Sequence, residues 1–243
     1  MKTLVIIPSR MSATRLPGKP LLKINGLSII SHVCKKAEEA NVGDVIVATE
    51  DKEIIADVKR NGFNAILTSN KHKTGTDRIY EALQKSNIKD VDFIMNLQGD
   101  EPAIDIDDLK SLNNKMGNNH SNLGTLASLI KDNKKLKNEN IVKVITENSL
   151  NEDRFPKAVS FSRISEQTDN IYQHIGVYCF SKDCLEKFVQ LDQSKNEIEN
   201  RLEQLRALDN NIDINVSLAK SSPIGVDTEE DYLALKKIME YKN

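Results

Sequence analysis

The sequence contains few cysteines and no long hydrophobic run, and both absences restrict its class. Cys34, Cys179 and Cys184 are odd in number and follow neither a disulfide nor a metal-binding spacing, which is typical of proteins in a reducing cytosol. No apolar run approaches the roughly 20 residues of a membrane span. The first one, 4–7, ends at Pro8 and is too short for a signal peptide. We therefore expect a soluble, cytoplasmic protein without a membrane span.

An excess of charge of one sign is absent as well. The chain has 34 Lys and Arg against 36 Asp and Glu, a formal net charge of −2. A protein that binds DNA or RNA usually presents a basic face, so this balance argues against nucleic acid as the main partner. With 243 residues, the chain is long enough for one large α/β domain, or for such a domain with a small appended subdomain.

The two common glycine-rich phosphate loops are missing. No G-x-G-x-x-G follows the first apolar segment, so the usual dinucleotide fingerprint is absent. Gly18 and Lys19 are followed by Pro20, with no glycine at the upstream position that a P-loop requires. A phosphate-binding loop in this chain would therefore have to use side chains rather than a row of backbone amides.

A basic loop does follow the first apolar segment. Arg10, Arg15 and Lys19 are grouped around the turn-forming Pro17 and Gly18. Guanidinium groups match phosphate oxygens and lysine adds a point charge, and the ends of strands are where open α/β sheets bind ligands. The loop therefore favours a polyphosphate ligand, while a solvated basic loop is the alternative.

Strand-like and helical segments alternate along the chain, which predicts βαβ units and a parallel sheet. We expect strands at 3–7, 44–48, 65–67, 91–97, 123–130, 141–146, 158–162, 175–180 and 214–218. We expect helices at 28–40, 51–60, 76–85, 106–115, 182–189, 195–208 and 229–241. Asp51 is the expected N-cap of its helix.

Two aspartates follow predicted strands or apolar segments. Asp100 comes after the apolar segment 91–97, between Gly99 and Pro102, and Asp227 precedes the last helix. Magnesium prefers one or two carboxylates together with substrate phosphates, so the pair and the basic loop predict a metal-assisted phosphoryl-transfer site. The alternative is that both residues serve turns or helix caps. Since Thr228 is an adequate cap by itself, Asp227 is free for another role.

Three further positions have polar groups suited to substrates. Thr76 and Arg78 lie at the start of a predicted helix, where Thr76 is the expected cap and Arg78 either turns to a nucleotide or pairs with Asp77. Gln98 suits hydrogen bonds to a sugar or a base edge.

A later cluster is a candidate for a second substrate. Arg163 follows a predicted strand and suits a carboxylate. Gln173 and His174 enter another strand, where a histidine is more often structural.

Six motifs occur in an order that resembles one enzyme family. The motifs are Pro8-Ser9-Arg10 with Thr14-Arg15-Leu16-Pro17-Gly18-Lys19-Pro20-Leu21, Gly75-Thr76-Asp77-Arg78, Gln98-Gly99-Asp100-Glu101-Pro102, His174-Ile175-Gly176-Val177-Tyr178, Leu202-Glu203-Gln204-Leu205-Arg206 and Gly225-Val226-Asp227-Thr228. Together they resemble the 3-deoxy-manno-octulosonate (Kdo) cytidylyltransferases, or CMP-Kdo synthetases, over almost the full chain. The opening motif alone is also similar to that of sialic-acid cytidylyltransferases and other sugar nucleotidyltransferases.

The resemblance implies a fold and an organisation. The fold is α/β and Rossmann-like, of the nucleotide-diphospho-sugar transferase type, with a mainly parallel central sheet and an inserted dimerisation and sugar-binding region. It implies a single domain over 1–243, in which 1–130 mainly binds CTP and 131–243 contributes the sugar site, the dimer contacts and the second metal carboxylate. A homodimer is the implied assembly.

The resemblance also implies an activity. The enzyme would transfer CMP from CTP to Kdo, giving CMP-Kdo and pyrophosphate for lipopolysaccharide biosynthesis, with Mg²⁺ as cofactor. The implied triphosphate ligands are Arg10, Arg15 and Lys19, the metal ligands Asp100 and Asp227, and the catalytic residues Arg10, Lys19, Asp100 and Asp227. The other implied nucleotide contacts are Ser9, Thr76, Arg78 and Gln98, and the sugar contacts are Arg163, Gln173, His174 and Tyr178. No side chain stands out as a general base.

Some positions depart from the family pattern on the sugar side. Asn200 replaces a usual glutamate, although Glu197 remains, the segment 164–166 lacks the usual Ile-Pro, and Gln173 replaces a residue that is commonly basic. An amino-substituted Kdo analogue or a sialic-acid-type sugar is therefore the alternative substrate. A nucleotide-binding protein without catalysis is a rival from another class, but it would not need both metal carboxylates.

Overall fold

The structure is a computed structural model that describes residues 1–220 and 222–241, apart from the side chain of Asn133. The chain divides into two compact units: unit 1 comprises Met1–Leu109 and Pro223–Asn243, and unit 2 comprises Lys110–Ser222. The first boundary lies within helix α4 (Ile106–Asn118). These units differ from the predicted halves 1–130 and 131–243, because the last segment of the chain returns to unit 1.

Unit 1 is built on a parallel sheet, as predicted. Its strands are β1 (Thr3–Ser9), β4 (Gly43–Thr49), β5 (Asn64–Leu67) and β6 (Phe93–Asn96). They pair in the order β6-β1-β4-β5, and every pairing is parallel. Residues 4–7 of β1 are fully buried, in keeping with the continuous apolar sequence of a parallel strand that is covered on both faces.

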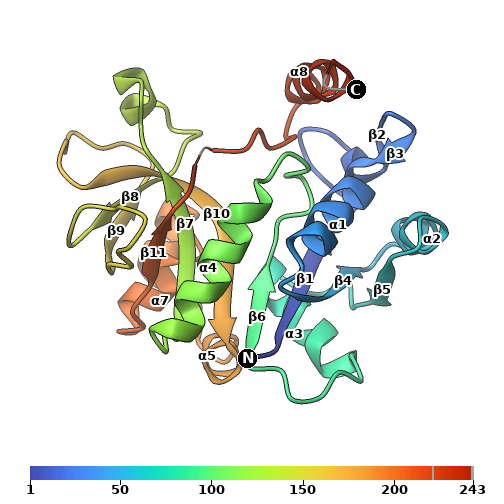
Figure 1. Cartoon of the computed structure of the whole chain (residues 1–243), viewed down its shortest axis with the longest axis horizontal. Helices are drawn as coiled ribbons and strands as arrows, with labels where there is room; N and C mark the ends of the chain where they lie inside the picture. Colours follow the sequence, from blue (N-terminus) through green and yellow to red (C-terminus); the bar gives the residue numbers. More distant parts are fainter. Residues whose placement is uncertain (221, 242–243) are drawn as a thin grey trace. The chain divides into compact units, whose positions relative to one another are not determined.

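Most helices of unit 1 pack on this sheet, whereas its last helix contacts a short hairpin (Figure 1). The helices are α1 (Ile29–Ala40), α2 (Lys52–Arg60), α3 (Gly75–Lys85) and α8 (Glu229–Glu240), with a 3₁₀ turn η1 (Lys19–Leu21) and a hairpin formed by β2 (Lys23–Ile24) and β3 (Leu27–Ser28). Helix α3 contacts β1, β4 and β5, and α1 contacts β1 and β4. The hairpin was not predicted from the sequence. The carboxyl ends of β1 and β6 thus support the loops that carry the basic and acidic motifs.

Three predicted helix caps have different outcomes. Thr228 caps α8 as expected, because its hydroxyl accepts a hydrogen bond from the amide of Asp231. The prediction for Thr76 was wrong, because Thr74 begins α3 and accepts from the amide of Asp77. Asp51 stands at the N-cap position of α2 but makes no capping hydrogen bond there.

Unit 2 contains a second set of strands, which is mostly antiparallel (Figure 1). They are β7 (Leu123–Ser128), β8 (Lys143–Thr146), β9 (Ala158–Ser162), β10 (Ile171–Ser181) and β11 (Asn215–Leu218). Their order is β11-β7-β10-β8-β9, in which only β11 and β7 are parallel.

Apart from the part of α4 that belongs to unit 2, the helices of this unit are short. They are α5 (Lys182–Phe188), α6 (Lys195–Asn200) and α7 (Leu205–Asp209), with a 3₁₀ turn η2 (Asn133–Lys137). The single helix predicted over 195–208 is wrong, because Arg201 adopts a left-handed conformation (φ 54°) that ends α6. Within the described residues, no helix is both long and apolar enough to cross a membrane.

Candidate nucleotide-binding site

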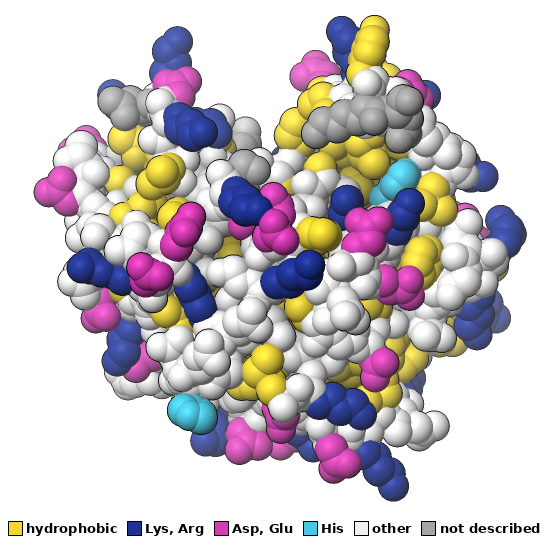
Figure 2. Space-filling view, in the orientation of Figure 1, with side chains coloured by type: hydrophobic (Ala, Val, Ile, Leu, Met, Phe, Trp, Pro, Cys, Tyr) yellow, Lys and Arg dark blue, Asp and Glu magenta, His cyan; other side chains and the backbone are white. Residues whose placement is uncertain are grey.

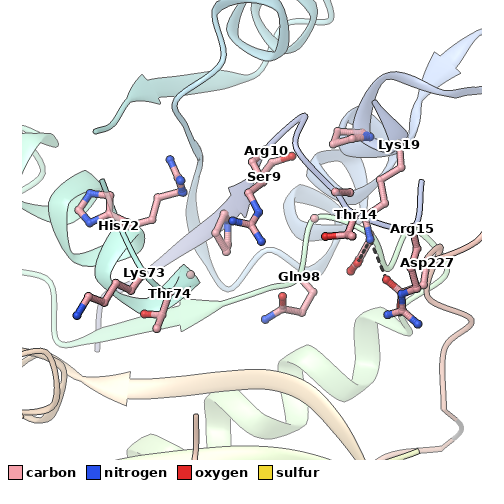
Figure 3. Close-up of a pocket in the computed structure, with 17 residues that line it drawn as sticks. Ser9, Arg10, Thr14, Arg15, Lys19, His72, Lys73, Thr74, Gln98 and Asp227 are labelled. Carbon is pink, nitrogen blue, oxygen red and sulfur yellow. Dashed lines mark hydrogen bonds and ion pairs between the residues drawn. The ribbon is translucent and has the colours of Figure 1, made fainter. Parts of the chain in front are cut away.

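A cavity of about 380 Å³ lies in unit 1 (Figure 3). It is lined by Pro8, Ser9, Arg10, Ala13, Thr14, Arg15, Lys19, Pro20, His72, Lys73, Thr74, Gly75, Arg78, Gln98, Gly99, Asp100 and Asp227. These residues come from the end of β1 with the basic loop and η1 that follow it, from the segment after β6, from the loop before α3 and its first turn, and from the segment before α8. The cavity therefore brings together all the predicted catalytic, metal and nucleotide residues except Thr76, which is buried but is not in its lining.

Backbone hydrogen bonds and the carboxylate of Asp51 hold the basic loop in shape. The carbonyl of Met11 accepts hydrogen bonds from the amides of Ala13 and Gly18 at 2.9 and 3.0 Å. Gly18 has φ +75°, a conformation that side-chain-bearing residues rarely adopt. The amide of Met11 donates to Asp51 Oδ2 at 2.8 Å. Asp51 therefore anchors the loop instead of capping α2.

The two predicted metal ligands are brought together by a direct backbone contact. The amide of Val226 donates to the carbonyl of Asp100 at 2.9 Å, so Asp227 follows immediately after the contact point. Gly99 allows the loop to lie close to β1, because a Cβ at this position would be 2.9 Å from the carbonyl oxygen of Pro8. Segments that are far apart in sequence thus present two carboxylates at one end of the cavity.

Lys19 lies between these carboxylates. Its ammonium is 2.6 Å from Asp100 Oδ2 and 3.0 Å from Asp227 Oδ1. The guanidinium of Arg15 contacts the other oxygen of Asp227 at 2.9 Å. Burial by itself lowers the pKa of Lys19, but the two carboxylates outweigh it and the pKa lies above its ordinary value. Lys19 is therefore protonated, and both carboxylates point at one cation.

The side chains of the last residue of β1 and of the residue after it have no partner among the described residues. The hydroxyl of Ser9 is buried without a hydrogen bond, and a buried polar atom in that condition costs free energy unless a ligand or water satisfies it. Arg10 is exposed, and its side chain makes no hydrogen bond or ion pair with another described residue. Both residues line the cavity between its two ends (Figure 3).

Arg78 lines the cavity, but its guanidinium is already engaged. It is 4% exposed, forms an ion pair with Glu50, and donates to Thr68 Oγ1 at 2.7 Å and to the carbonyl of Ser69 at 3.3 Å. Pairing with Asp77, the alternative considered for this residue, is therefore wrong. Arg78 instead fixes the segment that precedes α3.

Several residues of the lining were not predicted from the sequence. His72 and Lys73 lie at the end of the cavity opposite Arg15, Lys19 and Asp227 (Figure 3). His72 stands between Lys71 and Lys73 in a polar loop, and this run matches no motif that marks a ligand site. Their position beside the Gly75-Thr76-Asp77-Arg78 motif is the one signal that would have found them.

The predicted sugar residues all belong to unit 2. Arg163 is engaged by the backbone: its guanidinium donates to the carbonyls of Glu139, Asn200 and Arg201 at 3.0–3.3 Å. Gln173 accepts a hydrogen bond from Lys135 at 3.0 Å. A lysine therefore lies beside the position where the family commonly has a basic residue.

His174 and Tyr178 form part of an aromatic cluster on β10. His174 packs edge-on against Phe161, and its Nε2 lies 3.0 Å from Thr125 Oγ1. Burial lowers the pKa of His174 to about 3, and burial with the charge of Glu203 raises the pKa of Tyr178 well above its ordinary value. Both side chains are therefore neutral, and a role in sugar binding stays a prediction for them and for Arg163 and Gln173.

Comparison with known proteins identifies the family. The model of the cytidylyltransferase family matches residues 4–214. The 3-deoxy-manno-octulosonate cytidylyltransferase of Agrobacterium fabrum is 38% identical over 98% of this chain and 95% of its own length, and that of Rhodopseudomonas palustris is 40% identical over 98% of both. The chain belongs to the 3-deoxy-manno-octulosonate cytidylyltransferase family. The resemblance stated from the sequence motifs is confirmed.

Solved structures agree with this family and with the predicted fold class. A CMP:2-keto-3-deoxy-manno-octonic acid synthetase in complex with CTP has a TM-score of 0.90 and 32% identity, and all of both chains is covered. A UDP-glucose pyrophosphorylase has a TM-score of 0.73 at 18% identity, with both chains fully covered, which shows a shared fold alone. The prediction of a nucleotidyltransferase fold is confirmed.

The departures from the family pattern can now be placed in the structure. Glu197, which is present in this chain, forms a buried bidentate ion pair with the guanidinium of Arg206, with hydrogen bonds of 2.6 and 2.8 Å. Asn200, the replaced position, is exposed and donates to the carbonyl of Asn196. The charge pair of this segment is therefore complete without a glutamate at position 200.

Proposed function

We propose that the protein transfers CMP from CTP to Kdo, giving CMP-Kdo and pyrophosphate. The observation that carries the proposal is the convergence of Asp100 and Asp227 on the ammonium of Lys19, at one end of a cavity with basic residues. Membership of the family supports the nucleotide and the sugar acid. The arrangement provides opposite charges where a metal ion and a triphosphate would have to meet.

Asp100 and Asp227 fit magnesium as the cofactor. Their oxygens already lie within 3.0 Å of one cationic group, and magnesium prefers one or two carboxylates completed by substrate phosphates. Among the described residues there is no cluster of three or more carboxylate, histidine or cysteine side chains that could hold an ion. The metal would therefore depend on the nucleotide for its other ligands. When bound, it would neutralise charge on the transferring phosphoryl group.

The side chains of the basic loop stabilise the transfer itself. The anomeric oxygen of the sugar forms a bond to the α-phosphorus, and the bond from this phosphorus to the bridging oxygen breaks, so pyrophosphate leaves with the electron pair. Negative charge grows on the transferring and leaving oxygens, and Arg10, Arg15 and Lys19 supply positive charge there. The proton of the sugar hydroxyl is released to solvent water, which balances the step.

Sialic-acid-type sugars and an amino-substituted Kdo analogue are the alternative substrates. Lys135 beside Gln173 adds a positive charge to unit 2, which suits an acidic sugar of any of these kinds. A homodimer, a cytoplasmic location and a role in lipopolysaccharide biosynthesis stay predictions.

Pyrophosphate release tests the proposal. The full chain is incubated with CTP and magnesium, and Kdo, its 8-amino analogue and a sialic acid are offered in parallel reactions. We expect release with Kdo. Release only with another acid would keep the nucleotide part and overturn the sugar part, and no release with any acid would favour a protein that binds nucleotide without catalysis.

A further inference from the structure

The loop between β5 and α3 forms one end of the cavity. Its residues 69–74 include His72, Lys73 and Thr74, which are in the lining. Figure 3 shows these three at the end away from Arg15, Lys19 and Asp227. A nucleoside triphosphate is elongated, so a triphosphate at the charged end places the base and ribose toward this loop.

Two side chains of helix α3 hold the start of this loop through the backbone amide and carbonyl of Ser69. The amide of Ser69 donates to Glu81 Oε2 at 2.8 Å, and its carbonyl accepts from Arg78 at 3.3 Å. Arg78 and Glu81 are three residues apart and therefore share one face of the helix. Two side chains of opposite charge thus fix the position of Ser69 relative to α3.

The carboxylate of Glu81 also binds the far part of the loop. Its Oε2 contacts Nε2 of His72, whose side chain is 19% exposed, and Lys85 contacts Oε1 at 2.5 Å. Burial by itself raises the pKa of Glu81, but hydrogen bonds from Lys85, His72 and Ser69 lower it to about 2. The carboxylate is therefore charged at neutral pH and accepts hydrogen bonds from two points of the same loop.

We propose that His72 and Glu81 are a pair of positioning residues that hold the 69–74 loop and so shape the nucleoside end of the cavity. The inference rests on the proposed function, because it takes the ligand to be a nucleoside triphosphate. Nε2 of His72 is the donor to Glu81, so the hydrogen bond, rather than contact between the imidazole ring and substrate, carries the role. A glutamine has an amide nitrogen at a similar distance from the backbone and can replace that donor.

Calorimetric binding of two magnesium complexes tests the pair. CTP uses both ends of the cavity, whereas inorganic tripolyphosphate uses the charged end alone. We expect His72→Ala to weaken CTP binding about tenfold, the scale of one hydrogen bond to a charged group, and to leave tripolyphosphate binding within about twofold. His72→Gln should restore most of the CTP affinity, and Glu81→Gln should weaken CTP binding in the same direction as His72→Ala.

Lys85→Met is the matched control. Lys85 contacts the same carboxylate but is half exposed and is not in the cavity lining, so this variant should bind both ligands as the unaltered protein does. Equal losses for both ligands in His72→Ala, or no loss for CTP, would overturn the inference. Failure of His72→Gln to restore CTP binding would also overturn the inference, because that result would assign the role to contact between the imidazole ring and the nucleotide.

Hydrogen exchange in the free protein separates this inference from the proposed function. His72→Ala should speed exchange of the Ser69 amide and its neighbours without any nucleotide present. If the unaltered protein binds tripolyphosphate but not CTP, the proposed function fails, and the exchange result still decides whether the pair holds the loop. Unchanged exchange in both His72→Ala and Glu81→Gln would reject it.

Discussion

Lys19 has two sets of partners that it cannot satisfy at the same time. Its ammonium now lies between Asp100 and Asp227, and the proposed reaction requires the same group to contact phosphate. Binding of a triphosphate would draw the ammonium away and leave both carboxylates available to a metal ion. We therefore expect nucleotide and magnesium to bind cooperatively, each replacing part of an ion-pair network that the protein forms by itself.

Replacing Lys19 with methionine should weaken CTP binding by about ten- to a hundredfold. The change keeps the length of the side chain but removes a charge that contributes about 1.5–3 kcal/mol in a charge-assisted contact. Calorimetric titration with CTP measures it. Lys23→Met is the control, because Lys23 follows closely in sequence but its side chain is exposed. Equal affinities of the unaltered protein and Lys19→Met would remove Lys19 from the triphosphate site.

Replacing Asp100 with asparagine should leave CTP binding measurable and lower turnover by about a hundredfold or more. The amide keeps the shape but loses the charge that would hold a metal. Pyrophosphate release gives turnover, and calorimetry gives binding. Asp44→Asn, at an exposed position of β4, should be without effect, and normal turnover of the Asp100 variant would exclude Asp100 from the metal site.

At the scale of secondary-structure elements, close approach of the ends of β1 and β6 sets the position of the metal carboxylates. Gly99→Ala places a Cβ 2.9 Å from the carbonyl oxygen of Pro8 and 3.2 Å from the Ile30 side chain. Relief of that contact must shift backbone, so we expect a loss of about 1–3 kcal/mol in the free energy of unfolding. Urea denaturation measures it. Gly75→Ala is the control, because the atoms nearest to its added Cβ are at ordinary distances of 3.5 Å or more. A larger loss of stability for Gly75→Ala than for Gly99→Ala would contradict this explanation.

The buried pair of Glu197 and Arg206 joins α6 to α7. Both side chains are less than 5% exposed, and removal of one partner of such a pair leaves the other charge buried, which costs about 3–5 kcal/mol. We expect a loss of that order for Glu197→Gln in urea denaturation at neutral pH. Glu199→Gln is the matched control on the same helix, because its pair with Lys195 is exposed.

The same pair predicts how stability depends on pH. Burial works to raise the pKa of Glu197, but hydrogen bonds from Arg206 and Gln193 outweigh it and lower the pKa below its ordinary value of 4.5. A lowered pKa means that the stabilisation is present above pH 4.5 and is lost as the pH falls through the value in the folded protein. The difference between the unaltered protein and Glu197→Gln should therefore shrink on acidification. A constant difference down to pH 2 would contradict this assignment.

At the scale of the whole molecule, every described residue of the candidate nucleotide site belongs to unit 1, and the predicted sugar residues belong to unit 2. A ligand that binds only the folded state raises the free energy of unfolding by RT ln(1 + L/Kd), where L is its free concentration. CTP with magnesium at about 100 times its dissociation constant should therefore add about 2.7 kcal/mol to the free energy of unfolding. Thermal denaturation with and without the ligands measures it.

Hydrogen exchange locates that stabilisation. Protection by CTP should appear in the basic loop, around Gly99 and Asp100, and in the 69–74 loop. Protection confined to unit 2 would contradict the assignment of the nucleotide site. Magnesium with inorganic sulfate is the control for a general effect of ions.

Local sequence determined the parallel strands and the motifs at their ends. Residues 4–7 are a continuous apolar run that ends at Pro8, so both the strand and the start of the basic loop can be predicted from neighbours in sequence. Motif order sufficed for the family, and the fold class follows from it. Cap positions were less certain, because Thr74 and Thr76 are equally suited by type and only the path of the chain selects Thr74.

Tertiary structure alone decided which side chains meet. Lys19 and Asp227 are 208 positions apart, and their contact depends on the return of the chain to unit 1 and on the hydrogen bond between Val226 and Asp100. Likewise, no sequence pattern predicts that Asp51 contacts the basic loop or that Glu81 contacts His72. Residue type and spacing determine which chemistry a side chain is capable of. Long-range packing determines which charges and hydrogen-bond partners surround that side chain.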